Sequence, residues 1–222
     1  MRPPTSLRPV LVVATVLGLL VTAACSDDGD GTSSSSSSSS TTIPIPSDPE
    51  LETMLLREGD LPPAFTVETG TEGADTITSF CAGEDAAAGL QASGRALVRI
   101  RREPVGVAVL QLVFRFRDDD AATFVRQAGE ILQRCHEVPD AQGLAFSYEP
   151  ATPAIDAVFA DADDFVARYG SSVGSATFNE DIAVFRRGDV AQLVAVLAVD
   201  TPRAEVDALS LAAFTAAVDR SR

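Results

Sequence analysis

The side chains with distinctive chemistry in this chain are three cysteines and one histidine: Cys25, Cys81, Cys135 and His136. Lysine is absent, which excludes a Schiff-base lysine, a P-loop lysine and a Ser-Lys dyad. A single histidine cannot form an HExxH zinc site. Adjacent residues on a helix point about 100° apart, so His136 is poorly placed to activate the Cys135 thiol. We therefore expect no enzyme, no metal site and no cofactor.

Arginines form the other group that could bind a ligand. Arg99 and Arg101 lie on one predicted strand and Arg115 lies on the next. Guanidinium groups bind carboxylates and phosphates through paired hydrogen bonds. These three residues are therefore a candidate site for an anion or a partner. The alternative is that they pair with Glu103, Asp118 or other acids at a sheet edge.

The first 24 residues have the organisation of a signal peptide. Arg2 and Arg8 precede an uncharged apolar run over residues 10–24, which is short for a bilayer span of about 20 residues. The run ends in Ala-Ala-Cys25, which resembles a bacterial lipobox, where the cysteine is acylated and becomes the new N-terminus. We expect a lipoprotein signal peptide over residues 1–24 and a lipid anchor, such as palmitate, on Cys25. A plain secretory leader and an uncleaved membrane anchor are the alternatives.

Lipidation of Cys25 would leave Cys81 and Cys135 as a pair in an oxidising compartment. A disulfide between them would close a loop of about 55 residues and stabilise the fold by ~4 kcal/mol in the chain-entropy model. The alternative is two structural free thiols.

The charge of the chain limits its partners. The formal net charge is −15, and loss of the two leader arginines makes it more negative. Such a surface repels nucleic acid, so we expect no nucleic-acid partner. The partners that remain are the membrane, through the lipid anchor, and an unknown small ligand or envelope protein.

The chain changes character after Cys25. Residues 25–46 combine the lipidated cysteine with an Asp/Gly stretch and a run of eight serines, which predicts a disordered linker. Residues 47–222 are long enough for one domain with its own core.

Periodicity predicts the elements of this domain. Residues 107–116 alternate as a half-buried strand, preceded by a weaker strand over 95–102. Apolar residues at three- and four-residue spacing predict a helix from Asp118 to Cys135. Further patterns predict a strand over 144–148, a hairpin turning at Gly188-Asp189, and a C-terminal helix after Pro202; residues 156–173 are interpreted as a loop or short helix. The order indicates an α+β fold: an antiparallel β-sheet with packed helices.

Three segments share features with a known family: Gly59-Asp60-Leu61-Pro62, the run from Phe114 to Cys135, and the hairpin over residues 186–190. Together they resemble actinobacterial lipoproteins related to the extracellular sensor domain of PknH-type receptor kinases. That resemblance implies a compact sheet-and-helix body with a cleft for an extracellular signal, and it carries over no catalytic residues. The chain departs from the pattern in having one candidate cysteine pair where the kinase-linked domains have two, and in having no kinase.

These expectations lead to a functional hypothesis. The chain is a membrane-anchored extracytoplasmic lipoprotein whose extracellular domain is a non-enzymatic ligand-binding or sensor-like module. Two alternatives remain: a carrier of an apolar cell-envelope molecule, and a structural partner of an envelope protein. A large apolar cavity would favour the carrier, and an apolar surface on an exposed sheet face would favour the protein partner.

Overall fold

The computed structural model describes residues 45, 47–68, 79–80, 84–102, 106–117, 119–134, 147–159 and 164–222. All of them belong to one compact unit, Ile43–Arg222. The predicted leader, the lipidation of Cys25, the pairing of Cys81 with Cys135 and the role of His136 lie outside the described residues. Among the helices that the structure describes, none combines the length and apolar character required to cross a bilayer.

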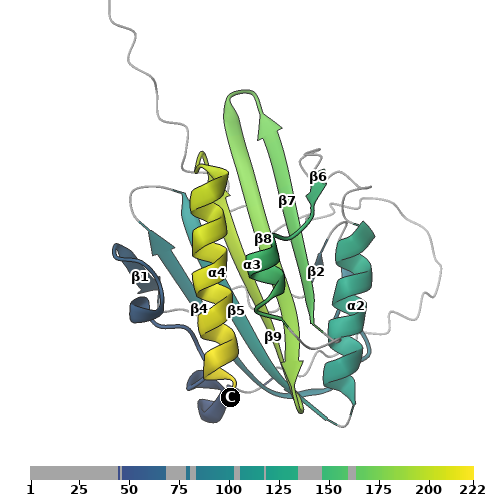
Figure 1. Cartoon of the computed structure of the whole chain (residues 1–222). Coiled ribbons are helices and arrows are strands. Elements are labelled where there is room, and N and C mark those ends of the chain that lie inside the picture. Colours follow the sequence, from purple (N-terminus) through teal and green to yellow (C-terminus); the bar gives the residue numbers. More distant parts are fainter. Residues whose placement is uncertain are drawn as a thin grey trace, which may run out of the picture. The chain divides into compact units, whose positions relative to one another are not determined.

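The described elements form a seven-stranded antiparallel sheet with packed helices, which confirms the predicted α+β class. The strand order is β1-β4-β5-β9-β8-β7-β6 (Figure 1). Strands β2 and β3 form a separate pair. The strands are β1 (Phe65–Glu68), β2 (Ser79–Phe80), β3 (Glu84–Asp85), β4 (Ala92–Arg102), β5 (Val107–Phe116), β6 (Ser147–Glu149), β7 (Phe165–Val173), β8 (Ala176–Arg187) and β9 (Val190–Val199). The helices are α1 (Pro49–Glu52), the 3-10 helix η1 (Glu58–Asp60), α2 (Asp120–Arg134), α3 (Pro153–Asp156) and α4 (Arg203–Arg220).

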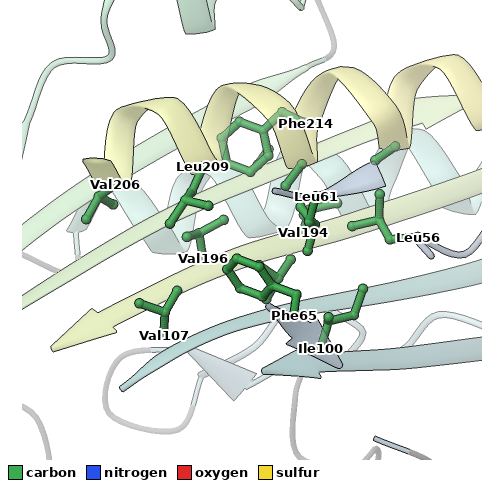
Figure 2. Close-up of a cluster of buried hydrophobic side chains, with 14 of the residues drawn as sticks. Leu56, Leu61, Phe65, Ile100, Val107, Val194, Val196, Val206, Leu209 and Phe214 are labelled. Carbon is green, nitrogen blue, oxygen red and sulfur yellow. The ribbon is translucent and has the colours of Figure 1, made fainter. Parts of the chain in front are cut away.

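Each face of the sheet packs against a different long helix. On one face, Val194 and Val196 of β9 join a core with Leu209 and Phe214 of α4 (Figure 2). The other face presents Leu193, which packs in a core with residues of α2. Alternate residues of a strand point to opposite faces, so both faces of the central strand β9 are buried, which explains its nearly continuous apolar sequence. We call the two sides the α4 face and the α2 face.

Several local patterns produced the elements that they predict. The β8–β9 hairpin turns at Gly188-Asp189, and Gly188 has a φ of 62°, a conformation that glycine adopts without steric cost. The helix predicted to start at the Asp118–Asp120 run is present as α2, and its first-turn Asp120 faces the positive end of the helix dipole.

The segment 156–173 is expected from the sequence to be a loop or short helix, and the structure corrects this. Among its described residues, only Asp156, the last residue of α3, is helical, and Phe165–Val173 is the strand β7. The pattern is hidden because Arg168 and Gly170 stand at positions where a buried strand usually has apolar residues.

Candidate functional site

The three arginines singled out in the sequence do not share one surface. Arg99 of β4 lies opposite Leu110, so Arg99 and Arg101 are on the α2 face. Arg115 lies two residues after Val113 in β5 and therefore on the same face of the sheet. Val113 is buried on the α4 face, so Arg115 is on that face too. The structure therefore brings Arg99 and Arg101 together and separates them from Arg115.

Each of the three has a carboxylate partner. Glu68 of β1 pairs with Arg101 at 2.9 Å and with Arg99 at 3.9 Å. Arg115 pairs with Glu50 at 2.8 Å and Asp48 at 3.3 Å, and the hydrogen bond to Glu50 raises the pKa of Arg115. Pairing with acids, the alternative considered for these residues, is therefore what the geometry shows, with Glu68, Glu50 and Asp48 as the partners. Glu103 and Asp118 lie outside the described residues.

The contacts of Arg115 fix the start of the domain. Asp48 caps α1 by accepting hydrogen bonds from the backbone N–H groups of Glu50 and Leu51. It also lies close to the backbone of β4, since a Cβ added to Gly94 would be 2.7 Å from Asp48 Oδ2. Arg115 therefore has a structural role in docking the first helix on the sheet.

A different surface has the shape of a ligand site. An open groove of about 560 Å³ lies where β6, β7 and β8 meet the junction between β9 and α4. That volume is in the usual range for small-molecule sites. The groove, which we call the polar groove, is lined by Ser147, Glu149, Gly170, Ser171, Ser172, Thr177, Phe178, Asn179, Asp200, Thr201, Pro202 and Arg203.

The register of the strands explains how polar side chains gather in the groove. Directly paired residues of neighbouring strands lie on the same face. Ser147, Gly170 and Asn179 form one such row across β6, β7 and β8, and Ser172 and Thr177 form a second row at the β7–β8 hairpin. Asn179 also pairs with Ala198 of the α4-side core, so both rows lie on the α4 face.

At Gly170 the floor of the groove has no side chain, and the side chains of Glu149 and Ser147 approach the backbone there. A Cβ at this position would lie 2.8 Å from Glu149 Oε1 and 3.7 Å from Ser147 Oγ. Glycine inside a strand is unfavourable for the strand itself and often marks a place where another group approaches the backbone. The Glu149 carboxylate therefore takes up the space above Gly170 that a side chain on this residue would fill.

The first turn of α4 borders the groove. Pro202 is the N-cap and supplies no side-chain hydrogen bond, and in the described part of the chain the backbone N–H groups of Arg203 and Ala204 have no acceptor. Uncapped N–H groups carry the positive end of the helix dipole. The junction is held by Asp200, which has a positive φ of 51° and accepts a hydrogen bond from Thr177 N at 2.9 Å.

A buried ionic network lies beneath the groove. Arg168 is 4% exposed and contacts Asp181, Asp207 and the backbone oxygen of Pro150. Asp181 is fully buried and also accepts hydrogen bonds from Arg203 Nη2 at 2.5 Å and Ser210 Oγ at 2.7 Å. Burial raises the pKa of Asp181 even though the hydrogen bond from Ser210 and the charge of Arg168 act to lower it.

This network determines how the groove can act. Burial acts to lower the pKa of Arg168, but the carboxylates of Asp181 and Asp207 outweigh it and raise that pKa. The network joins β7, β8 and α4, and broken buried pairs leave costly uncompensated charges. The floor of the groove is therefore rigid, and its charged groups are paired with one another. A preorganised floor under exposed hydroxyl groups is suited to binding.

A second groove runs along the exposed side of α2. It is lined by Asp119, Ala122, Thr123, Val125, Arg126, Gly129, Glu130, Gln133, Asp164 and Phe165. Arg126 and Glu130 form an i, i+4 pair with side chains 60% and 55% exposed, which is typical of a solvated helix surface. Across the described residues, no three His, Cys, Asp or Glu side chains are placed to hold a metal ion.

Comparisons with known proteins add little. No family model matches the chain, and neither does any curated protein. Among solved structures, the chain is similar to the extracellular domain of PknH from Mycobacterium tuberculosis, with 14% identity and a TM-score of 0.43, over 70% of this chain and 77% of that one. A likeness this distant says nothing about what the chain binds.

The polar groove is not apparent in the sequence because its residues come from distant segments. Ser147, Gly170, Asn179 and Arg203 meet only after β6, β7, β8 and α4 have assembled. One local signal is present: Gly170 and the two serines after it are small residues inside a strand, next to a charged Arg168 that must be neutralised if it is buried.

Proposed function

We propose that this chain is a lipoprotein of the extracytoplasmic membrane face, anchored through Cys25, whose domain binds a small polar ligand in the polar groove without catalysing a reaction. The observation that carries the proposal is the groove itself: hydroxyl and amide groups arranged on a floor that the Arg168–Asp181 network makes rigid. The leader and the cysteine at its end support the anchor.

The described surfaces favour this function over the two alternatives. A carrier of an apolar molecule needs an enclosed apolar cavity, whereas both grooves described above are open to solvent, and the second one carries charged side chains such as Asp119, Arg126 and Glu130. A protein that docks through an apolar patch needs several large hydrophobic side chains together. Among the described residues, the large hydrophobic side chains that are exposed are Val67 and Tyr148. They lie on β1 and β6, the opposite edges of the sheet, so they form no common patch.

Blocking the groove tests the proposal. Gly170→Val would place a branched side chain on the groove floor, in a strand where β-branched residues are well tolerated. The exposed Glu149 carboxylate can move aside, so we expect the variant to fold. As a control, Thr123→Val changes the second groove on α2.

The assay is thermal unfolding of the purified protein against a panel of small polar compounds. A compound at about 100 times its Kd stabilises the folded state by ~2.7 kcal/mol, which corresponds to a rise in Tm of roughly 5–10 °C for a domain of this size. We expect the rise in the parent protein and in Thr123→Val but not in Gly170→Val. An equal rise in all three proteins would refute the groove as the site.

The anchor is tested separately by cell fractionation. Cys25→Ala should move the protein from the membrane to the soluble fraction, because several acyl chains are needed for firm attachment. Cys81→Ala is the control and should stay with the membrane. Retention of Cys25→Ala in the membrane fraction would contradict lipid anchoring.

A further inference from the structure

We infer that the ligand of the polar groove is a saccharide: a polyhydroxylated compound that is neutral or carries an amine, and not an anion. This inference rests on the proposed function, since it names the chemical class that the same groove would take. It follows from the hydrogen-bonding capacity of the lining, from the charge around it and from the shape of its floor.

The lining offers both donors and acceptors at short intervals. A hydroxyl or an amide group does both. The hydroxyl groups of Ser172 and Thr177 face the same side of the β7–β8 hairpin, and neither has a hydrogen-bond partner among the described residues. Ser147 Oγ donates to Gly170 O at 3.0 Å and keeps its accepting lone pairs. A ligand whose own hydroxyl groups both donate and accept matches such a lining.

Asn179 lines the groove and has hydrogen-bonding capacity that is not used within the protein. Its Nδ2 donates to Thr201 O at 3.3 Å, and its Oδ1 accepts from Arg203 Nη1 at 3.4 Å. An amide has two N–H donors and two acceptor lone pairs, so one of each remains. Because the two existing bonds fix its orientation, Asn179 can present these groups to a ligand with little loss of side-chain entropy.

The charge around the groove disfavours an anion. Asp181 and Asp207 in the floor, and Glu149 and Asp200 at the rim, are four carboxylates. Arg168 and Arg203 are the two guanidinium groups among them. The formal charge of this set is therefore −2. The N–H groups at the start of α4 act in the opposite sense, but a helix terminus supplies only about half a unit of positive charge.

Arg203, the cation nearest to a bound ligand, is already occupied. Its Nη2 donates to Asp181, its Nε lies 3.1 Å from Asp207 Oδ1, and Glu149 Oε2 lies 3.6 Å from the same nitrogen. A phosphate or carboxylate would have to displace one of these carboxylates and then lie beside it. An amine, by contrast, can pair with Glu149, whose side chain is 41% exposed.

The floor of the groove has no side chain of its own at Gly170. This residue stands between Ser147 and Asn179 in one row, and Glu149 Oε1 lies 2.8 Å from where its Cβ would be. The groove is also open to solvent and of about 560 Å³. An open site with polar groups on its borders accepts a ring that lies along the strands, once the flexible Glu149 side chain moves aside or pairs with the ligand.

The inference is tested by isothermal titration calorimetry, in which the purified full-length protein is titrated with four defined disaccharide probes. The probes are maltose, N,N′-diacetylchitobiose, its deacetylated diamine and digalacturonate. We expect the neutral and diamine probes to bind, with digalacturonate at least about tenfold weaker. Asn179→Ala should weaken the neutral probes by about tenfold, the effect of losing roughly 1.4 kcal/mol of hydrogen bonding.

Glu149→Gln separates the charge argument from the shape argument. It should abolish any preference for the diamine over the acetylated probe and leave the neutral probes bound. Gln133→Ala in the second groove is the matched control and should behave as the parent protein.

Each alternative result decides between the proposed function and the saccharide class. If digalacturonate binds best and Gly170→Val abolishes its binding, the groove is the site but the saccharide class as stated is wrong. The saccharide class is also wrong if no disaccharide binds while other polar compounds raise the Tm of the parent protein but not of Gly170→Val. If neither kind of compound binds in a manner sensitive to Gly170→Val, the proposed function itself is refuted.

Discussion

Glu180 provides a test of how burial of a charge limits the stability of this fold. It lies on β8 between Tyr169 of β7 and Leu197 of β9, on the α2 face. It is half-buried and has no hydrogen bond or ion pair among the described residues. Burial, with a smaller contribution from the neighbouring Asp181 carboxylate, raises the pKa of Glu180 from 4.5 to about 7.

The direction of the effect follows from proton binding. Below pH 4.5 the carboxyl group is protonated in both the folded and the unfolded states. Between pH 4.5 and about 7 the unfolded chain releases a proton that the folded protein retains, so the free energy of unfolding falls as the pH rises. The full difference corresponds to ~3.4 kcal/mol at about 1.36 kcal/mol per pH unit. Because the side chain is only half-buried and solvent screens its charge, we expect about 1–2 kcal/mol.

The perturbation is Glu180→Gln, which keeps the shape and removes the charge. Urea unfolding at about pH 3.5, 6, 7 and 8 should show equal stability at the lowest pH and a variant more stable by about 1–2 kcal/mol at pH 8. Glu52→Gln on the exposed side of α1 is the control for loss of a surface charge. A difference between parent and Glu180→Gln that stays constant over this range would refute the reasoning.

Three further predictions follow from the core, the C-terminus and the cysteines. Gln111→Leu should lower the free energy of unfolding by about 1–3 kcal/mol, because the buried Leu56 N–H would lose the Gln111 Oε1 acceptor at 2.6 Å. Gln192→Leu leaves that hydrogen bond intact and should lower the free energy of unfolding by less in the same urea titration. Equal losses in the two variants would contradict this explanation. Asp60→Asn should lower the free energy of unfolding by about 1 kcal/mol at pH 7. Burial acts to raise the pKa of Asp60, but its hydrogen bonds with Arg220 and Arg57 outweigh burial and lower that pKa. The carboxylate therefore stabilises the fold at neutral pH, and the difference between parent and variant should shrink as the pH falls below 3.8. Non-reducing peptide mapping should find Cys81 joined to Cys135, and free thiols that react with an alkylating reagent would defeat that prediction.

The sequence supports prediction best where the signal is local. The strand over residues 107–116 and the helix before Arg134 are present where the periodicity predicts them. The expectation of a half-buried strand is wrong, because β5 is a central strand: Val109 is buried in the core with α4 and Leu112 in the core with α2. Whether the three arginines share one face could not be predicted from local patterns, because it depends on the register of β4 against β5. A slip of one residue moves a side chain to the opposite face, and the register places Arg99 opposite Leu110 and Arg115 opposite Gly94.

Strand β7 and the polar groove could not be predicted from local sequence patterns. Arg168 can be buried in a strand only because Asp181 of β8 and Asp207 of α4 neutralise it. Neither partner is adjacent to it in the chain. The pattern of β7 alone therefore pointed to a loop, and the energetic reason for a strand became visible only with the other elements in place.

Taken alone, the amino-acid sequence determined the class of fold, the principal strands and helices, and the expectation of an exported, anchored protein, because hydrophobic periodicity and a leader are properties of contiguous residues. The tertiary structure decided which polar groups meet. It separated Arg115 from Arg99, paired each with a carboxylate, and brought Gly170, Asn179 and Arg203 to one groove. The physical reason is that cross-strand pairing and helix docking join residues far apart in the chain, and the charges and hydrogen bonds of a site depend on those distances.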